Sequence, residues 1–171
     1  MCIRDRANTK YHYRIKTGAQ ESTVHSFRTL PLPGQPMTAG GHLRFLIMGD
    51  NQIKAQPRFD SLVVFAKRNC EQLYGPNIND SLSMILMVGD QVDVGTLDHY
   101  EFVHFAKNRY LSGELPIGTI IGNHETYGTL QLGAYENHFF YDKIQYADVP
   151  SNSERYYAYQ VGPVLIINLN T

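Results

Sequence analysis

Residues 84–93 read MILMVGDQVD, an apolar run followed by a glycine and then by two aspartates, Asp90 and Asp93. A segment that is apolar at every position is typical of a strand buried on both faces, as in a parallel sheet. Carboxylates at the end of such a strand lose hydration unless a cation or a protonated group meets them. The stretch therefore predicts a buried strand whose end binds a positively charged partner.

The same unit recurs on either side of this stretch. The apolar runs 43–48 and 116–121 read as strands, and helical spacing of apolar residues fills 57–74 and about 97–111, with Pro57 in a first-turn position. Strand, helix, strand, helix, strand predicts an α/β fold with a mainly parallel sheet. A last pair, RYYAYQV and VLIINLN around Gly162-Pro163, predicts an antiparallel hairpin.

The N-terminal segment has a different pattern. Residues 10–15 and 23–28 alternate around a turn and predict a β-hairpin, and because a hairpin alone is marginally stable, we expect residues 7–31 to end a larger β-domain. The proline- and glycine-rich residues 32–41 predict a linker to a second domain, 42–171. Residues 1–6 begin with MCIRD, which resembles a translated sequencing adapter and is left out of the fold.

The composition excludes several classes of protein. Of 171 residues, 18% are charged and 43% apolar, and the net charge is -1, so neither a disordered chain nor a nucleic-acid partner attracted by bulk charge is expected. No apolar run reaches the roughly 18 residues of a membrane span. Cys2 falls in the adapter-like segment, and Cys70 alone supports no disulfide framework.

Polar residues end all three buried strands. Gly49-Asp50, Gly89-Asp90 and Gly122-Asn123 each follow one strand. Ligands of open α/β sheets bind outside the carboxyl ends of the strands, so we expect these side chains in one crevice, where their oxygen donors suit a metal ion. One Gly-Asp step is usually a plain turn, but three in one sheet favour a site. The third step continues into His124 and adds an imidazole.

These motifs resemble those of the calcineurin-like metallophosphoesterase superfamily, namely Asp-x-His or a variant, Gly-Asp-x-x-Asp (or Tyr) and Gly-Asn-His-Glu/Asp. The chain has them in order as 50–52 (DNQ), 89–93 (GDQVD) and 122–125 (GNHE). Residues 8–31 resemble the last two strands of the fibronectin-like domain that precedes the catalytic domain of purple acid phosphatases. The implied fold is the N-terminal half of a layered α/β sandwich, preceded by the last hairpin of a fibronectin type III-like domain.

The resemblance implies a role for each motif residue. Asp50 would bind the first of two metal ions (Fe, Mn or Zn), Asp90 would bridge both, and Asn123 would bind the second. His124 would lie beside the leaving group of a small phosphate monoester, which a metal-bound hydroxide would attack.

Two positions depart from the purple enzymes. Asp93 stands where they have a tyrosine ligand, so the purple colour is not expected, and in the wider superfamily this aspartate pairs with the motif histidine. Asp93 and His124 would then form an acid dyad. Gln52 stands where many relatives have a histidine ligand, and its amide oxygen is a weaker candidate ligand.

The remaining metal histidines of the superfamily come from later motifs, an apolar-x-x-His and a Gly-His-x-His, and this chain ends before either of them. We therefore expect an N-terminal fragment that binds metal weakly and is inactive alone, from a protein that is secreted or periplasmic.

Two alternatives stay open. The same metal pair serves phosphodiesterases and nucleotidases of the superfamily. A non-catalytic extracellular binding protein with a degenerate phosphatase-like domain is the other reading, and the late histidines would distinguish it from the enzymes.

Overall fold

The structure is a computed structural model, and it describes residues 5–35, 42–52, 58–141, 145–146, 149–150 and 155–170. The first four residues of the adapter-like segment, most of the expected linker and Pro57 lie outside the described residues.

A parallel sheet forms the centre of the molecule. It contains β5 (Phe45–Met48), β6 (Met84–Val88) and β7 (Ile117–Ile120) in the order β5-β6-β7. The pairing is parallel throughout, with Ile47 opposite Leu86 and Leu86 opposite Gly118. The three predicted strands and their parallel pairing are therefore confirmed.

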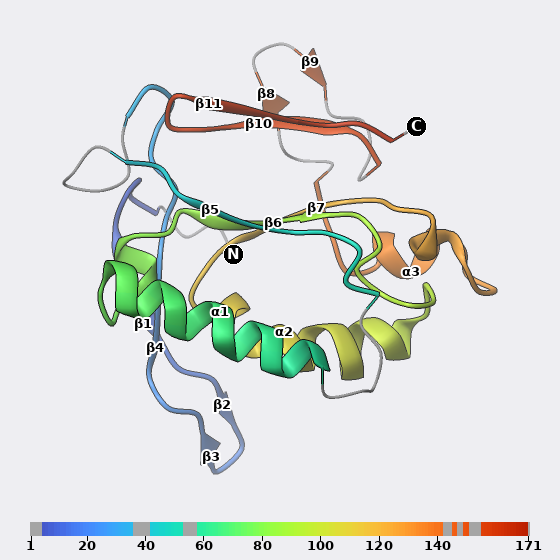
Figure 1. The fold of residues 1–171 in the computed structure, drawn as a ribbon, viewed down its shortest axis with the longest axis horizontal. Coiled ribbons are helices and arrows are strands. Elements are labelled where there is room, and N and C mark those ends of the chain that lie inside the picture. Colours follow the sequence, from blue (N-terminus) through green and yellow to red (C-terminus); the bar gives the residue numbers. More distant parts are fainter. Residues whose placement is uncertain are drawn as a thin grey trace.

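Helices cover one face of this sheet (Figure 1). They are α1 (Arg58–Tyr74), α2 (Phe105–Ser112) and, directly before α2, the π-helical segment η2 (His99–His104). The helix predicted from about Leu97 to Leu111 is confirmed: the chain is helical from Leu97, passes through the π-helical turns of η2 and ends with α2. A core of apolar side chains fills the layer between helices and sheet: Met48, Phe59, Val63, Ile78, Leu82, Ile85, Met87, Leu111 and Leu115.

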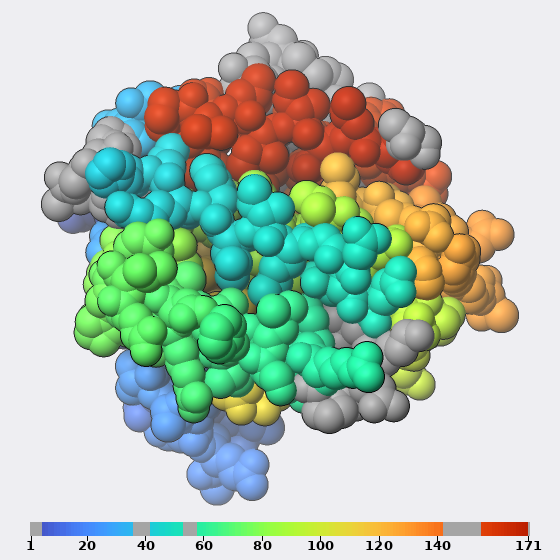
Figure 2. All heavy atoms as spheres, viewed as in Figure 1, coloured from blue at the N-terminus to red at the C-terminus, as the bar shows by residue number. Residues whose placement is uncertain are grey.

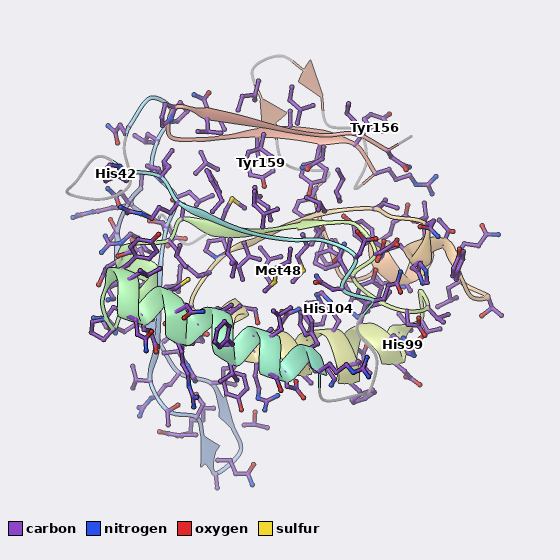
Figure 3. All side chains as sticks on the ribbon, in the orientation of Figure 1. His42, Met48, His99, His104, Tyr156 and Tyr159 are labelled. Atoms are coloured by element: carbon purple, nitrogen blue, oxygen red, sulfur yellow. The ribbon has the colours of Figure 1, made fainter. Side chains whose placement is uncertain are left out.

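The opposite face of the sheet is covered by the predicted C-terminal hairpin, β10 (Tyr157–Val161) and β11 (Val164–Asn168). Figure 3 shows Tyr159 in the layer between this hairpin and the sheet, while Met48 lies on the helix side. The Tyr159 hydroxyl lies 3.8 Å from the Met84 sulfur, and a Cβ at Gly118 would come within 2.2 Å of that hydroxyl. Gly118 is therefore required for the hairpin to pack this closely.

The N-terminal hairpin packs against the body of the protein. It pairs β1 (Lys10–Tyr13) with β4 (His25–Arg28), and the short strands β2 (Lys16–Thr17) and β3 (Gln20–Glu21) form its tip, which projects from the body (Figure 2). Lys10 and Arg28 both bind the carboxylate of Asp80, at 2.9 and 2.5 Å. The Tyr13 hydroxyl also donates to the Gly113 carbonyl at 2.7 Å. The hairpin itself was predicted correctly. That it ends a fibronectin-like domain stays a prediction.

Shorter elements complete the described chain: η1 (Ile78–Asp80), η3 (His124–Thr126), α3 (Gly133–Glu136), β8 (Gln145–Tyr146) and β9 (Val149–Pro150). Among the described residues, none of the helices has the length and apolar character that crossing a membrane requires.

Candidate active site

The predicted site residues follow the ends of the three parallel strands. Asp50 lies two residues after β5, Asp90 two after β6 and Asn123 three after β7. Because the strands run parallel, these residues share one edge of the sheet. The backbone N–H of Gln52 donates to the Asp90 carbonyl at 2.6 Å, so the loops after β5 and β6 are in direct contact.

Strained backbone is concentrated in these loops. Asp50, Gln52 and Asp90 have φ values of 50°, 38° and 50°, in the left-handed region that residues other than glycine rarely adopt. Such conformations persist only where the surroundings impose them, and they occur most often at functional sites. Their occurrence here supports a function for this edge of the sheet.

Gly122 allows a close approach between the loops after β6 and β7. A Cβ at this position would lie 2.2 Å from Oδ1 of Asp90 and 2.5 Å from its backbone nitrogen. Any side chain at residue 122 would therefore displace Asp90. The Gly-Asn step after β7 is thus needed to bring two candidate ligands together.

Asp90 is the most enclosed of the candidate ligands, with 8% of its surface exposed. The backbone N–H of His124 donates to its Oδ1 at 3.0 Å. The amide of Asn123 lies beside the same carboxylate and fits in two orientations. With its nitrogen toward Asp90, it donates to both carboxylate oxygens at 3.2 Å, and its oxygen accepts from the Tyr127 hydroxyl at 2.7 Å.

In the other orientation the Asn123 nitrogen donates to the Tyr127 hydroxyl, and its oxygen faces the Asp90 carboxylate. The amide oxygen of Asn123 and the two carboxylate oxygens of Asp90 then face one another with no hydrogen bond between them. This arrangement is favourable only if a cation lies beside the three oxygens. The first orientation satisfies the protein by itself, whereas the second is the one that a metal ligand requires.

His124 is held by Asp93, but through the backbone. The Nδ1 atom of His124 lies 2.8 Å from the Asp93 carbonyl oxygen and 3.9 Å from the nearest carboxylate oxygen. Because a carbonyl oxygen only accepts, Nδ1 carries the proton, which leaves Nε2 as the ring nitrogen able to exchange one. The closest contact between these two residues is therefore made by the main chain of Asp93, and their role as an acid dyad stays a prediction.

Two contacts of the site were not predicted. The ring of Tyr127 lies 4.6 Å from that of His124, in addition to its contact with Asn123. The carboxylate of Glu125 accepts backbone N–H groups from the loop after β6. Burial raises the pKa of Glu125, and the four backbone donors act in the opposite direction.

A buried polar cluster lies behind these loops. Gln91, Tyr100, His104 and Asn108 have no exposed surface, and each has a side-chain atom without a hydrogen-bond partner. Figure 3 shows His104 between the sheet and the helical layer. Burial, followed by the charge of Glu125, raises the pKa of Tyr100, which places this cluster next to the site.

The donors fit part of a metal centre. Asp90 and Asn123 together offer carboxylate and amide oxygens at one point, and Asp50 and Gln52 lie on the adjoining loop. Such oxygens suit Mg, Mn or Fe ions. In the part of the chain that the structure describes, however, no three His, Cys, Asp or Glu side chains gather in a group able to hold a metal ion. Among the described residues, these oxygen donors therefore do not form a complete metal site.

Solved structures share this arrangement of strands, helices and loops. The fold is similar to part of a purple acid phosphatase. PPD1, a purple acid phosphatase from seeds of yellow lupin (Lupinus luteus), aligns with a TM-score of 0.58 and 20% identity, over 92% of this chain and 28% of that protein. PhoD aligns with a TM-score of 0.53 and 16% identity, over 96% of this chain and 37% of its own.

The chain therefore spans well under half the length of either of these two proteins. No protein-family model and no curated protein matches the sequence. At identities of 20% and 16%, the likeness concerns the fold, and the chemistry has to be argued from the site residues themselves.

Proposed function

We propose that this chain carries the first three motifs of a binuclear metal-dependent phosphoesterase of the calcineurin-like superfamily, which hydrolyses small phosphate monoesters. The observation that supports this most directly is the hydrogen-bonded group of Asp90, Asn123 and His124 at the carboxyl edge of a parallel sheet. The fold shared with a purple acid phosphatase adds support.

Each residue has a proposed role. Asp50 and Asp90 bind metal through their carboxylates, Asn123 binds through its amide oxygen, and Gln52 is a weaker candidate ligand. When bound, two metal ions would supply the positive charge that stabilises the phosphoryl group and the acidity that makes a water nucleophilic at neutral pH. His124, oriented through Nδ1 by Asp93, can deliver a proton from Nε2 to the departing oxygen.

The proposal also includes the wider context of the protein. The oxygen donors described here form an incomplete set, so further ligands, imidazoles in this superfamily, have to come from outside the described residues. We propose that the N-terminal hairpin ends a fibronectin-like domain and that the protein is secreted or periplasmic. The longest reading frame that contains residues 42–171 is therefore the protein to test.

A phosphatase assay with that protein tests the proposal. After loading with Mn²⁺ or Zn²⁺, we expect hydrolysis of p-nitrophenyl phosphate and much slower hydrolysis of bis-p-nitrophenyl phosphate. His124→Ala should retain the metal and lose roughly 100-fold or more in kcat, because a positioned acid contributes about that much. Faster cleavage of the diester would replace the monoesterase proposal by a phosphodiesterase, and loss of metal in His124→Ala would make His124 a ligand. Absence of metal-dependent hydrolysis of either ester would favour a non-catalytic binding protein.

A further inference from the structure

One buried carboxylate joins the ends of two strands of the sheet. Glu125 has no exposed surface, and both of its carboxylate oxygens are used. Its Oε2 accepts from the backbone N–H groups of Gly122 at 2.6 Å and Asp90 at 2.9 Å. Its Oε1 accepts from Gln91 at 2.7 Å and from Val92 at 3.4 Å. A single side chain in η3 therefore holds the loop after β6 and the turn after β7.

The four donors belong to the two segments that carry candidate ligands. Asp90 is one of them, and Gly122 immediately precedes Asn123. Asp90 has a φ of 50°, a conformation that its own side chain does not favour and that neighbouring contacts have to impose. Three consecutive N–H groups, of residues 90 to 92, point at one carboxylate and supply that constraint.

The loop after β6 also packs closely against the main chain of Glu125. A Cβ at Gly95 would lie 2.2 Å from the Glu125 carbonyl oxygen. Residues 90–95 therefore contact Glu125 both at its side chain and at its main chain. An ordinary helix cap would satisfy N–H groups of its own segment, whereas three of the four donors here come from another strand's loop.

We infer that Glu125 is a positioning residue of the metal site: it binds no metal itself, but it fixes Asp90 relative to Asn123 and His124 and so sets the affinity for the metal. The inference rests on the proposed function, in which Asp90 and Asn123 are ligands. Groups that orient metal ligands commonly change affinity by about 10- to 100-fold when they are replaced.

The isosteric variant Glu125→Gln is the direct test. Glutamine keeps the length of the side chain, but one of its two acceptors becomes an NH₂ group that faces backbone N–H donors. The affinity for Mn²⁺ alone is measured by calorimetry for the longest reading frame that contains residues 42–171, together with the melting temperature in chelator. We expect the Mn²⁺ dissociation constant to rise about 10- to 100-fold.

Two controls separate positioning from a loss of stability. Glu114→Gln removes a carboxylate that binds Lys67 on the way into β7, and should leave Mn²⁺ affinity unchanged. Val63→Ala removes a fully buried side chain of α1, and should lower the melting temperature without changing Mn²⁺ affinity. If Glu125→Gln does not fold, Glu125→Asp keeps the charge, is one methylene too short to reach both loops, and should weaken Mn²⁺ binding about tenfold.

The outcomes differ for the two proposals. Unchanged Mn²⁺ affinity in a folded Glu125 variant overturns the positioning role alone, as does an equal loss of affinity in Val63→Ala. If the unmodified protein binds no Mn²⁺, the proposed metal-dependent function fails and the inference fails with it.

Discussion

The backbone N–H of His124 donates to the carboxylate of Asp90 at 3.0 Å, so the second and third motifs of the chain are joined by one hydrogen bond. These residues are 34 positions apart in the sequence. The contact uses one carboxylate oxygen and leaves the other to interact with Asn123 or with a cation. Asp90 is therefore both a structural acceptor and the centre of the candidate donor set.

Asp90→Asn separates these two roles. Asparagine keeps the Oδ1 acceptor for His124 and tolerates positive φ, so we expect the fold to persist. The lost negative charge should weaken metal binding by about 100-fold or more, since even groups outside the ligand set change it by 10- to 100-fold. Metal content after dialysis and hydrolysis of p-nitrophenyl phosphate measure the effect. The exposed Asp98→Asn is the isosteric control, and equal metal retention in both variants would contradict the role of Asp90.

Gly122→Ala should damage the site through a single methyl group. The new Cβ would meet the backbone nitrogen of Asp90 at 2.5 Å, and backbone cannot move aside as a flexible side chain can. Overpacking of this kind costs about 1–3 kcal/mol. Urea unfolding and metal affinity should both report the change. In Gly133→Ala the nearest atom is 3.9 Å away, at the start of α3, so that variant should be neutral or more stable. Equal stability of the two variants would rule out the close approach at Gly122.

Much of the frame could be predicted from local patterns. Apolar runs predicted β5, β6 and β7, and helical spacing predicted α1. A strand buried on both faces is apolar at every position, whereas a helix buried on one face is apolar at every third or fourth position. The glycines before Asp90 and Asn123 were visible as turns. That Gly122 is also a point of close approach depends on its distance to Asp90, which a sequence does not contain.

The contacts that organise the site could not be predicted in the same way. Glu125 binds the backbone of residues 90–92, and main-chain N–H groups are the same in every residue and leave no pattern. His104 is buried because η2 and α2 turn it toward the sheet, and the wider π-helical turns of η2 shift the faces that a regular helical period predicts. Tyr127 is half exposed, so neither its contact with Asn123 nor that with His124 follows from its hydrophobicity.

Tyr127→Phe should reveal the orientation of the Asn123 amide. The Tyr127 hydroxyl can donate to the amide oxygen or accept from the amide nitrogen, so it supports both orientations. Without it, the amide nitrogen still has both Asp90 oxygens as acceptors when it points toward Asp90, whereas in the metal-binding orientation the nitrogen loses the Tyr127 hydroxyl as its acceptor.

We therefore expect Tyr127→Phe to weaken Mn²⁺ binding about fivefold, the equivalent of one hydrogen bond of about 1 kcal/mol. Calorimetry with Mn²⁺ measures this change. Tyr110 is a matched control, because it is also exposed and its hydroxyl accepts a hydrogen bond from Arg109, on a different part of the surface. A loss of affinity in Tyr110→Phe of the same size would show that the effect is not specific to Asn123.

Stability should fall in acid because of His104. Burial lowers the pKa of His104 from 6.5 to about 4; a backbone contact with Gln91 opposes this shift, and the charge of His138 adds to it. The rings of Tyr100, Phe105 and Phe139 surround the imidazole, and its Nε2 lies 3.5 Å from the Asn108 amide nitrogen. As the pH falls below 6.5, the unfolded chain binds a proton that the folded protein does not bind until about pH 4.

The contribution of neutral His104 is therefore complete above pH 6.5 and is lost progressively down to about pH 4, by an amount on the order of 3 kcal/mol. Urea unfolding at pH 7, 6, 5 and 4.5 measures the slope. His104→Gln removes the titrating group, so its stability should be lower at pH 7 and should depend less on pH across this window. His25→Gln, on the N-terminal hairpin, should keep the slope of the unmodified protein. If His104→Gln kept that slope as well, another group would be responsible for the acid sensitivity.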